Sequence, residues 1–321
     1  MTVIPTSGPH GGDGTRLAAA LGVRATDVLD LSASLNPFAP DPTGVLAGHL
    51  GAIGRYPDSE PARDALANAM GVTPNQLLLT NGGSEAIALA CDHVVRVFGA
   101  GSLRAHDFSL YERHLRAIRP DAPRVCSNPC NPTGALVDPS RGVDHDGVRV
   151  AVWDEAFWQL ATGTWTSHSH ERGAIVVGSL TKLFACPGLR LGYVLADART
   201  VTEMAERQPR WAVSTLAAEA LPDLLATARL TEWAVAIDEA RDALISEIDS
   251  RGFAATPGVT WVLVSLAGST GAELRHCFAQ HLVGVRDCAS FGLEAWVRIA
   301  IPRPSERAHL LAALSAIGTR R

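Results

Sequence analysis

Short apolar runs alternate with a helical pattern from about residue 46 to residue 227. Five apolar runs are predicted strands, because Pro, Gly and Asp clusters bound them and β-branched residues fill them: 75–80, 122–128, 148–157, 173–180 and 189–196. Residues 82–98 begin with a glycine pair and continue with a helical period. Strands that alternate with helices predict a mostly parallel sheet that is covered on both faces.

The pattern changes after about Leu216. A long helix is predicted over 231–252, and it is followed by alternating strands and helices: 259–266, 271–283, 283–288, 295–301 and 305–318. The extended segment 28–35 is expected to join this α+β unit. We therefore predict a large domain over 46–227 and a small domain that both chain ends form, 1–45 and 228–321.

Composition limits the classes of function. The chain has 321 residues, 47% hydrophobic and 19% charged, with a net charge of −5, so no basic surface for nucleic acid is expected. No apolar stretch approaches the roughly 18 residues that span a membrane, and the N-terminus lacks a signal-peptide pattern, which favours a cytoplasmic protein. Cys126 and Cys130 have no second close cysteine pair, so no metal site is expected.

One stretch, "SLTKLFACPGLRLGY", places a lysine among groups that bind anions. Lys182 lies between the hydroxyls of Ser179 and Thr181 and the guanidinium of Arg190. A lone lysine is usually a solvated surface charge. A lysine beside cationic groups at the end of a buried strand, however, can have its pKa lowered and become a nucleophilic amine. The stretch alone therefore indicates an activated amine near a phosphate, which is what a Schiff-base lysine needs.

Three other segments supply what a pyridoxal phosphate site needs. Asp154 ends a predicted strand and can keep a pyridine nitrogen protonated, although an Asp at this place is also typical of a helix N-cap. Asn131, in "SNPCNPTG", can donate to the ring oxygen, or it forms an ordinary Asx turn. Gly82, Gly83 and Ser84 lie between a strand and a helix, where amides bind phosphate.

In this order, the glycine-rich turn, "NPCNPTG", "DEAF" and "SLTKLFACPGLRLGY" resemble the fold-type I enzymes that use pyridoxal 5′-phosphate. The chain is similar to the histidinol-phosphate aminotransferase branch of these enzymes, over nearly its whole length. The resemblance implies an α/β fold, in which a large domain on a mostly parallel, seven-stranded type of sheet accompanies a small α+β domain. It also implies a homodimer with shared active sites.

The resemblance also implies roles for single residues. Lys182 would form the Schiff base, Asp154 would pair with the pyridine nitrogen, Asn131 would contact the ring oxygen, and Tyr111 would stack on the ring. The cofactor phosphate would be held by Gly83, Ser84, Ser179, Arg190 and, from the second subunit, Tyr56.

The two ends of the chain narrow the expected reaction. "HGGD" at 10–13, "LDLSASLNPFAP" and "GVRDCASFGLEAWVRIAIP" resemble the threonine-phosphate decarboxylases of cobalamin biosynthesis. Paired arginines suit a substrate with a carboxylate and a phosphate. The resemblance implies a lyase that decarboxylates L-threonine O-3-phosphate or a close relative such as O-phosphoserine. The expected substrate-binding residues are His10, Gly11, Ser34, Asn131, Arg286 and Arg298.

Alternatives remain open at this point. The first is an aminotransferase acting on histidinol phosphate or a related phosphorylated amine. The second is a homologue without activity that serves as a binding or assembly protein. The joint retention of four residues argues against it: Lys182, Asp154, Asn131 and Arg190. The "HGGD" segment is also compatible with a plain flexible arm.

The sequence departs from the family pattern at three places. Phe157 stands where many aminotransferases have a tyrosine, Ser34 stands where the decarboxylases usually have an asparagine, and the stretch from Tyr111 to Asn131 is short for the family.

Overall fold

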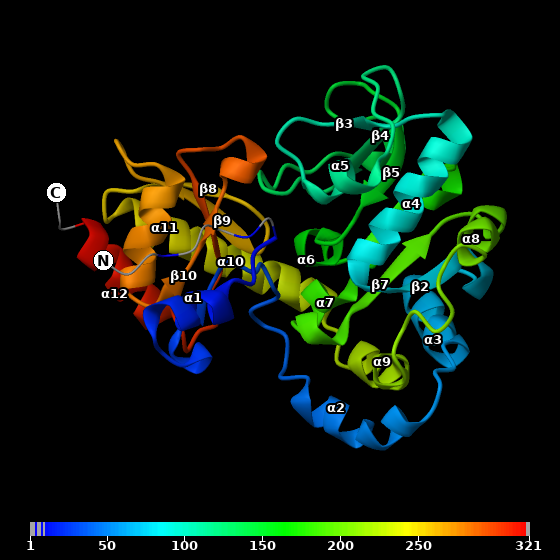
Figure 1. Ribbon diagram of the computed structural model, residues 1–321, viewed down its shortest axis with the longest axis horizontal. Helices are drawn as coiled ribbons and strands as arrows, with labels where there is room; N and C mark the ends of the chain where they lie inside the picture. The colour runs from blue at the N-terminus through cyan, green and yellow to red at the C-terminus, as the bar shows by residue number, and fades with distance from the viewer. Residues whose placement is uncertain (1–3, 5–7, 9, 319–321) are drawn as a thin grey trace. The chain divides into compact units, whose positions relative to one another are not determined.

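A computed structural model describes residues 4, 8 and 10–318 of the chain, which form two units (Figure 1). The first unit comprises the described residues up to Phe38, the segment Asn131–Gly134 and the chain from Val235 onward. The second comprises Ala39–Cys130 and Ala135–Ala234. These junctions differ from the expected boundaries at 46 and 228, and the expected division did not separate Asn131–Gly134 from its neighbours. Among the described residues, no helix is both long and apolar enough to cross a membrane.

The second unit is built on a mixed sheet. Its strands lie in the order β2 (Leu77–Asn81), β7 (Leu191–Leu195), β6 (Ile175–Ser179), β5 (Val150–Asp154), β4 (Arg124–Ser127) and β3 (Ser102–Leu103). Neighbours from β3 to β6 are parallel, whereas β7 runs antiparallel to both β6 and β2. The predicted α/β class is therefore confirmed. In the described residues this sheet has six strands in place of the expected seven, and the short connection before β4 contributes only an isolated bridge between Gly101 and Ile118.

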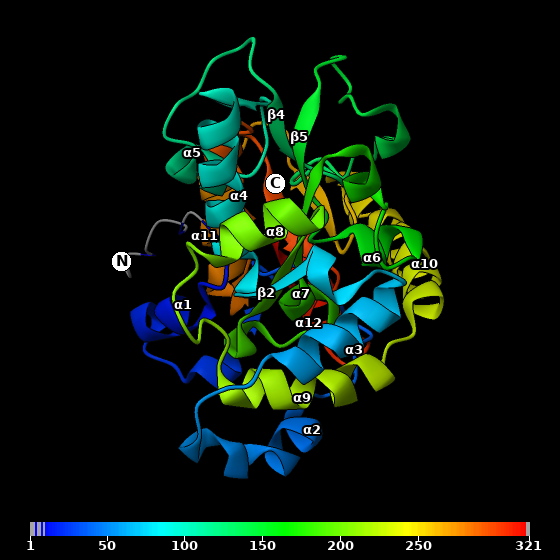
Figure 2. The same ribbon diagram turned by 90° about the vertical axis from the view of Figure 1, so that its right-hand side faces the viewer.

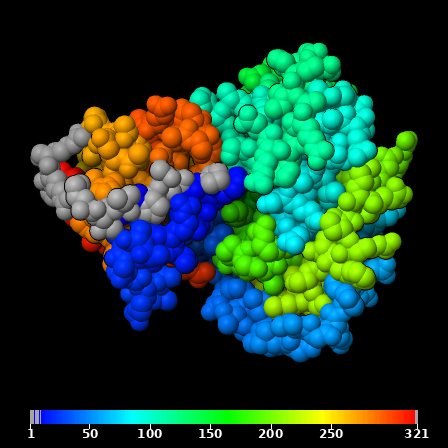
Figure 3. Space-filling model, viewed as in Figure 1, coloured from blue at the N-terminus to red at the C-terminus, as the bar shows by residue number. Residues whose placement is uncertain are grey.

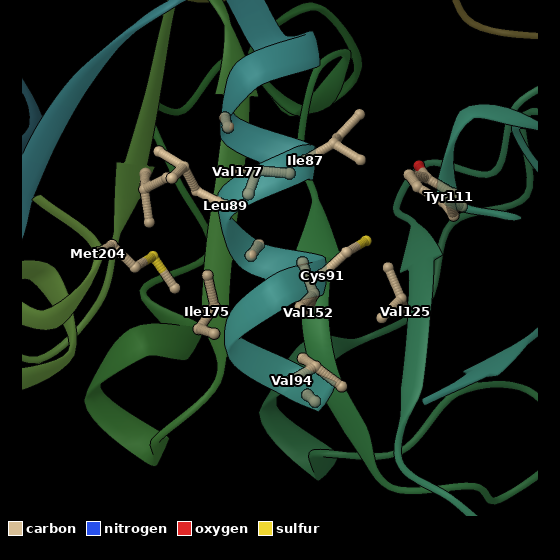
Figure 4. Close-up of a cluster of buried hydrophobic side chains, with 14 of the residues drawn as sticks. Ile87, Leu89, Cys91, Val94, Tyr111, Val125, Val152, Ile175, Val177 and Met204 are labelled. Carbon is tan, nitrogen blue, oxygen red and sulfur yellow. The ribbon is translucent and has the colours of Figure 1, made fainter. Parts of the chain in front are cut away.

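Helix α4 (Gly82–Phe98) packs across this sheet against β5, β6 and β7. Its buried side chains recur at helical spacing, and Figure 4 shows Cys91 and Val94 on the side of the helix where Val125 and Val152 of the strands lie. Full burial of such a side chain contributes roughly 1.5–3 kcal/mol relative to its exposure. This packing fixes the start of α4 beside the end of β6 and the start of β7.

Shorter helices complete the second unit. Helices α3 and α9 pack against each other, as Figure 2 shows, and α8 packs on β2. The bounds are α2 (Thr43–Gly48), α3 (Glu60–Met70), α5 (Leu110–His114), α6 (Trp158–Thr162), α7 (Leu180–Leu183), α8 (Ala198–Ala205) and α9 (Thr215–Ala226).

The first unit contains an antiparallel sheet in the order β11 (Arg286–Asp287), β12 (Val297–Ala300), β9 (Trp261–Ser265) and β8 (Ala254–Pro257). A separate parallel pair joins β1 (Leu29–Asp30) to β10 (Val283–Gly284). The single strand predicted over 283–288 is therefore divided, because its two halves pair with different partners. The helices of this unit are α1 (Gly14–Leu21), α10 (Leu230–Asp249, which begins in the second unit), α11 (Gly271–Gln280) and α12 (Arg307–Gly318).

Candidate active site

Three polar residues end neighbouring parallel strands of the second unit. Ser127 ends β4, Asp154 ends β5 and Ser179 ends β6, and Asp154 pairs in register with Ser127 and Val177. The carboxyl ends of parallel strands meet at one edge of a sheet, which is where α/β proteins bind ligands. Lys182 follows Ser179 on the one-turn helix α7, so the predicted lysine, aspartate and serine all come from this edge.

Asp154 is a buried carboxylate with two hydrogen bonds. Its Oδ2 accepts from the hydroxyl of Tyr111 at 2.8 Å, and its Oδ1 accepts from the backbone nitrogen of Ala156 at 2.9 Å. Burial raises the pKa of Asp154 to about 6, although the Tyr111 hydrogen bond and the charge of Lys182 act in the opposite direction. A carboxylate in this setting gains stability from a cationic partner placed against it.

The position of Tyr111 differs from the ring-stacking role expected for it. Only 1% of its surface is exposed, and its hydroxyl is directed to Asp154, so its ring belongs to the core that Figure 4 shows. Phe108 lies edge-on to it with 5.7 Å between ring centroids and is only partly buried. The structure therefore gives Tyr111 a contact to the carboxylate and makes Phe108 the more accessible aromatic ring.

The start of α4 forms a compact anion-binding arrangement. Gly82 has a φ of 71°, and a Cβ there would collide with the guanidinium of Arg190. A Cβ on Gly83 would lie 3.2 Å from the Cβ of Ser179. Ser84 is exposed in the first turn of the helix. The helix amides, a hydroxyl and a guanidinium therefore lie together, which suits a phosphate group.

The contacts of Arg190 support the assignment of a phosphate site at the start of α4. Its Nη1 donates to the backbone carbonyl of Pro187 at 3.4 Å, and among the described residues it forms no ion pair with a carboxylate. Ser179 Oγ lies 2.8 Å from Thr181 Oγ1.

Phe157 is the aromatic neighbour of Lys182. The Lys182 Nζ lies 6.0 Å from the ring centroid of Phe157, which is buried and has no hydroxyl.

The first unit holds the two predicted substrate arginines side by side. Arg286 on β11 and Arg298 on β12 are direct cross-strand partners, and both are buried. Arg298 Nη1 donates to Asn131 Oδ1 at 2.5 Å and its Nη2 to the carbonyl of Ser32 at 3.3 Å. Burial and then the charge of Arg286 lower the pKa of Arg298 to about 9. Like charges placed opposite each other destabilise a sheet, so this pair favours an anionic ligand.

Asn131 and Ser34 also belong to the first unit. The amide oxygen of Asn131 is occupied by Arg298, a contact that its expected role at the cofactor ring did not predict. Ser34 is buried, and its Oγ has no hydrogen-bond partner among the described residues. A ligand group that donates to or accepts from this hydroxyl would remove an unsatisfied buried polar group.

The N-terminal arm is attached to the same segment. The backbone nitrogens of Gly12 and Asp13 donate to Ser32 Oγ at 2.8 and 3.2 Å, while the Ser32 carbonyl accepts from Arg298. Gly11 has a φ of 61°, and a Cβ there would collide with the Ser32 carbonyl. His10, next to Gly11, is exposed. Ser32, which the sequence analysis did not select, therefore connects the arm to Arg298.

Tyr56 lies at the surface of the second unit. It is 77% exposed, and its ring centroid is 4.6 Å from that of Trp211.

Trp261 is a neighbour of Arg298 that was not predicted as a site residue. Its ring centroid lies 5.3 Å from the Arg298 guanidinium, and its indole nitrogen donates to the Pro132 carbonyl at 2.7 Å. Its place in an apolar strand gave no signal beyond that of a core residue.

The pKa of Asp154 gives a testable consequence for stability. Between its ordinary value of 3.8 and about 6, the unfolded chain ionises before the folded one, so rising pH destabilises the cofactor-free protein through this group. We expect Asp154→Asn to raise the free energy of unfolding of the cofactor-free protein at pH 7.5 by about 3 kcal/mol. The difference from wild type should disappear below about pH 4, as urea unfolding at the two pH values would measure; an equal difference at both would contradict it.

A second prediction concerns Tyr111. Because its hydroxyl stabilises the ionised carboxylate, Tyr111→Phe should raise the pKa of Asp154 further and weaken the binding of a cationic ring by about 1–2 kcal/mol, or roughly 5- to 30-fold. Titration of the cofactor-free variant with pyridoxal phosphate would measure this. Tyr193→Phe is the matched control, since that buried hydroxyl contacts Gln159. Equal losses in the two variants would contradict a specific role.

The chain is similar to known proteins over most of its length. The family described as aminotransferase class I and II matches residues 104–314. A histidinol-phosphate aminotransferase of Methanothermobacter thermautotrophicus is 26% identical, covering 94% of this chain and 92% of its own. A threonine-phosphate decarboxylase of Salmonella typhimurium is 27% identical, covering 97% and 96%. The crystal structure of histidinol-phosphate aminotransferase from Sinorhizobium meliloti in complex with pyridoxal-5′-phosphate has a TM-score of 0.81 at 20% identity, covering 98% and 95%.

Proposed function

Because the chain belongs to the aminotransferase class I and II family and uses pyridoxal 5′-phosphate, we propose that it decarboxylates a phosphorylated amino acid, with L-threonine O-3-phosphate as the preferred substrate. The observation that carries this proposal is the buried pair Arg286 and Arg298, which suits a small molecule with two anionic groups. The similarity to a threonine-phosphate decarboxylase over nearly the whole chain supports it.

The residues of the second unit fit the cofactor. In this proposal Gly83, Ser84, Ser179 and Arg190 hold its phosphate at the start of α4. Asp154 keeps a proton on the ring nitrogen, and Tyr111 orients that carboxylate. Phe108 replaces Tyr111 in the proposed stacking role, because the Tyr111 ring is buried.

When bound, pyridoxal phosphate supplies an electron sink for the pair of electrons that is released as a bond to the substrate Cα breaks. Lys182 provides the nucleophilic amine and then holds a proton near Cα. In this proposal Arg298 binds the substrate carboxylate while Asn131 orients Arg298, and Arg286 binds the second anion. His10, Gly11 and Ser34 bind the substrate from the arm and the segment next to it. Loss of carbon dioxide and protonation at Cα then yield the amino-alcohol phosphate.

The second candidate is transamination of histidinol phosphate or a related phosphorylated amine. Several histidinol-phosphate aminotransferases are similar to the chain at about the same identity as the decarboxylase. The residues that bind the cofactor serve both reactions. Phe157 favours decarboxylation mildly, because a tyrosine hydroxyl at this place would tune the proton transfer on which transamination depends.

The phosphate requirement tests the proposed substrate class. Threonine keeps the amino acid part of the substrate but lacks the second anion. Loss of the charge-assisted hydrogen bonds to that anion, at about 1.5–3 kcal/mol each, should lower kcat/KM roughly 10²- to 10⁴-fold relative to O-phosphothreonine. Carbon dioxide release from both compounds would measure the ratio. Equal rates with threonine would contradict the proposal.

A homodimer with shared active sites is part of this proposal. Leu50, Ile53, Tyr56 and Trp211 each expose more than half of their surface. The α2 segment and the adjoining residues to Gly54 lie at the surface beside α9 (Figure 3). A group of exposed large apolar side chains is typical of a protein interface. A second copy that covers it would bring its own Tyr56 toward the cofactor phosphate.

A further inference from the structure

A group of metal-binding side chains lies outside the candidate active site, on the short helical turn Ser169–Arg172 and the residue before it. His168, His170 and Glu171 each offer one ligand atom, and these three atoms lie within 4.8 Å of one another. His168 Nδ1 is 3.6 Å from Glu171 Oε1, and the two imidazole rings are 5.8 Å apart between centroids. Nothing in the proposed reaction uses this group.

His170 distinguishes the group from an ordinary set of surface charges. Only 4% of its surface is exposed, and its Nδ1 has no hydrogen-bond partner among the described residues. A buried nitrogen without a partner costs about 1–3 kcal/mol.

The spacing suits a tetrahedral ion. Metal–ligand bonds of about 2.0–2.2 Å place neighbouring ligand atoms of a tetrahedral zinc ion roughly 3.3–3.6 Å apart. The separation of 3.6 Å between His168 and Glu171 is therefore already close to that value. The side chains of His168 and Glu171 are 42% and 63% exposed, so rotation of these two can close the remaining separation to the fixed ring of His170.

The loop that carries these residues is anchored to the core. Glu155 is fully buried and accepts from Thr166 Oγ1 at 2.8 Å and from the backbone nitrogen of Ser167 at 3.2 Å. Ser167 Oγ in turn lies 2.6 Å from Ser169 Oγ. These bonds fix the backbone directly before His168 and His170, which reduces the ordering cost of binding an ion.

We propose that His168, His170 and Glu171 bind one divalent transition-metal ion of the zinc type, with a fourth position open to water. Two imidazoles and one carboxylate are a known ligand set for zinc with an open position. The ion stabilises the turn Ser169–Arg172. Ser169 of this turn contacts Ser167, which donates to Glu155, the residue after Asp154.

Equilibrium dialysis of the holoenzyme against Zn²⁺, in a buffer without phosphate or chelators, tests the proposal. One ion per chain is expected. His168→Ala and Glu171→Gln should each lower the affinity at least about tenfold and remove the rise in Tm that Zn²⁺ gives to the wild type. His114→Ala is the matched control, since that histidine lies beside Arg113 and Arg116 and should leave both results unchanged.

Cobalt substitution identifies the ligand atoms. The Co²⁺ protein should show a tetrahedral spectrum without thiolate-to-cobalt absorption, which excludes binding at the partly exposed Cys277. Binding that neither variant weakens, thiolate absorption, or no bound ion would each overturn the proposal. Because these readouts do not depend on turnover, they remain interpretable whichever reaction the enzyme catalyses.

Discussion

Lys182→Ala will lose both the yellow cofactor colour and at least about 10⁴-fold of the activity, as expected for removal of a nucleophile. Lys182 is the only lysine in the sequence, whereas the chain contains 27 arginines among its 28 basic residues. No other ε-amine can therefore replace it. Absorption spectra of the purified variant, before and after addition of pyridoxal phosphate, measure the first effect.

The single lysine also permits a direct chemical control. Borohydride reduction of the wild-type holoenzyme should attach the cofactor to one tryptic peptide, which contains Lys182, and to none in the variant. Label on the N-terminal amine alone, or colour that survives in Lys182→Ala, would contradict the role given to this residue.

Arg298→Ala will raise the KM for the substrate at least about 30-fold, which corresponds to the 2–5 kcal/mol that truncation of a buried charged partner costs. The cofactor colour should stay intact, since Arg298 contacts Asn131 and Ser32 of its own unit and is paired there with no carboxylate among the described residues. Substrate titrations followed by product release measure the change.

The matched control for this variant is Arg24→Ala. Arg24 also belongs to the first unit, but its side chain is 82% exposed and pairs with Asp27. We expect no change in KM for it, because exposed ion pairs contribute little. An equal increase in KM for the two variants, or loss of cofactor colour in Arg298→Ala, would contradict a specific role in substrate binding.

Residues that end apolar runs were the most predictable part of the site. Asp154 and Ser179 follow strands in the sequence and end parallel strands in the structure, because an apolar run fixes where a buried strand stops. The direction in which a side chain points could not be predicted in the same way. Phe108 and Tyr111 are three residues apart, and only packing against Asp154 decides which ring is buried.

Pairings between distant segments were the least predictable. The run 283–288 reads as one strand in the sequence, yet β10 pairs with β1 and β11 pairs with β12. Asn131 follows a strand of the second unit but bonds to Arg298 in the first. A local sequence pattern does not indicate such partners, because the pairing depends on which strand edges the whole fold leaves available.

The reaction itself is tested most directly by two incubations of the purified enzyme. One contains O-phosphothreonine alone, and the other contains histidinol phosphate with 2-oxoglutarate. We predict release of carbon dioxide and formation of an amino-alcohol phosphate in the first, with no glutamate in the second. Formation of glutamate in the second, without carbon dioxide in the first, would contradict the proposed decarboxylase and identify an aminotransferase.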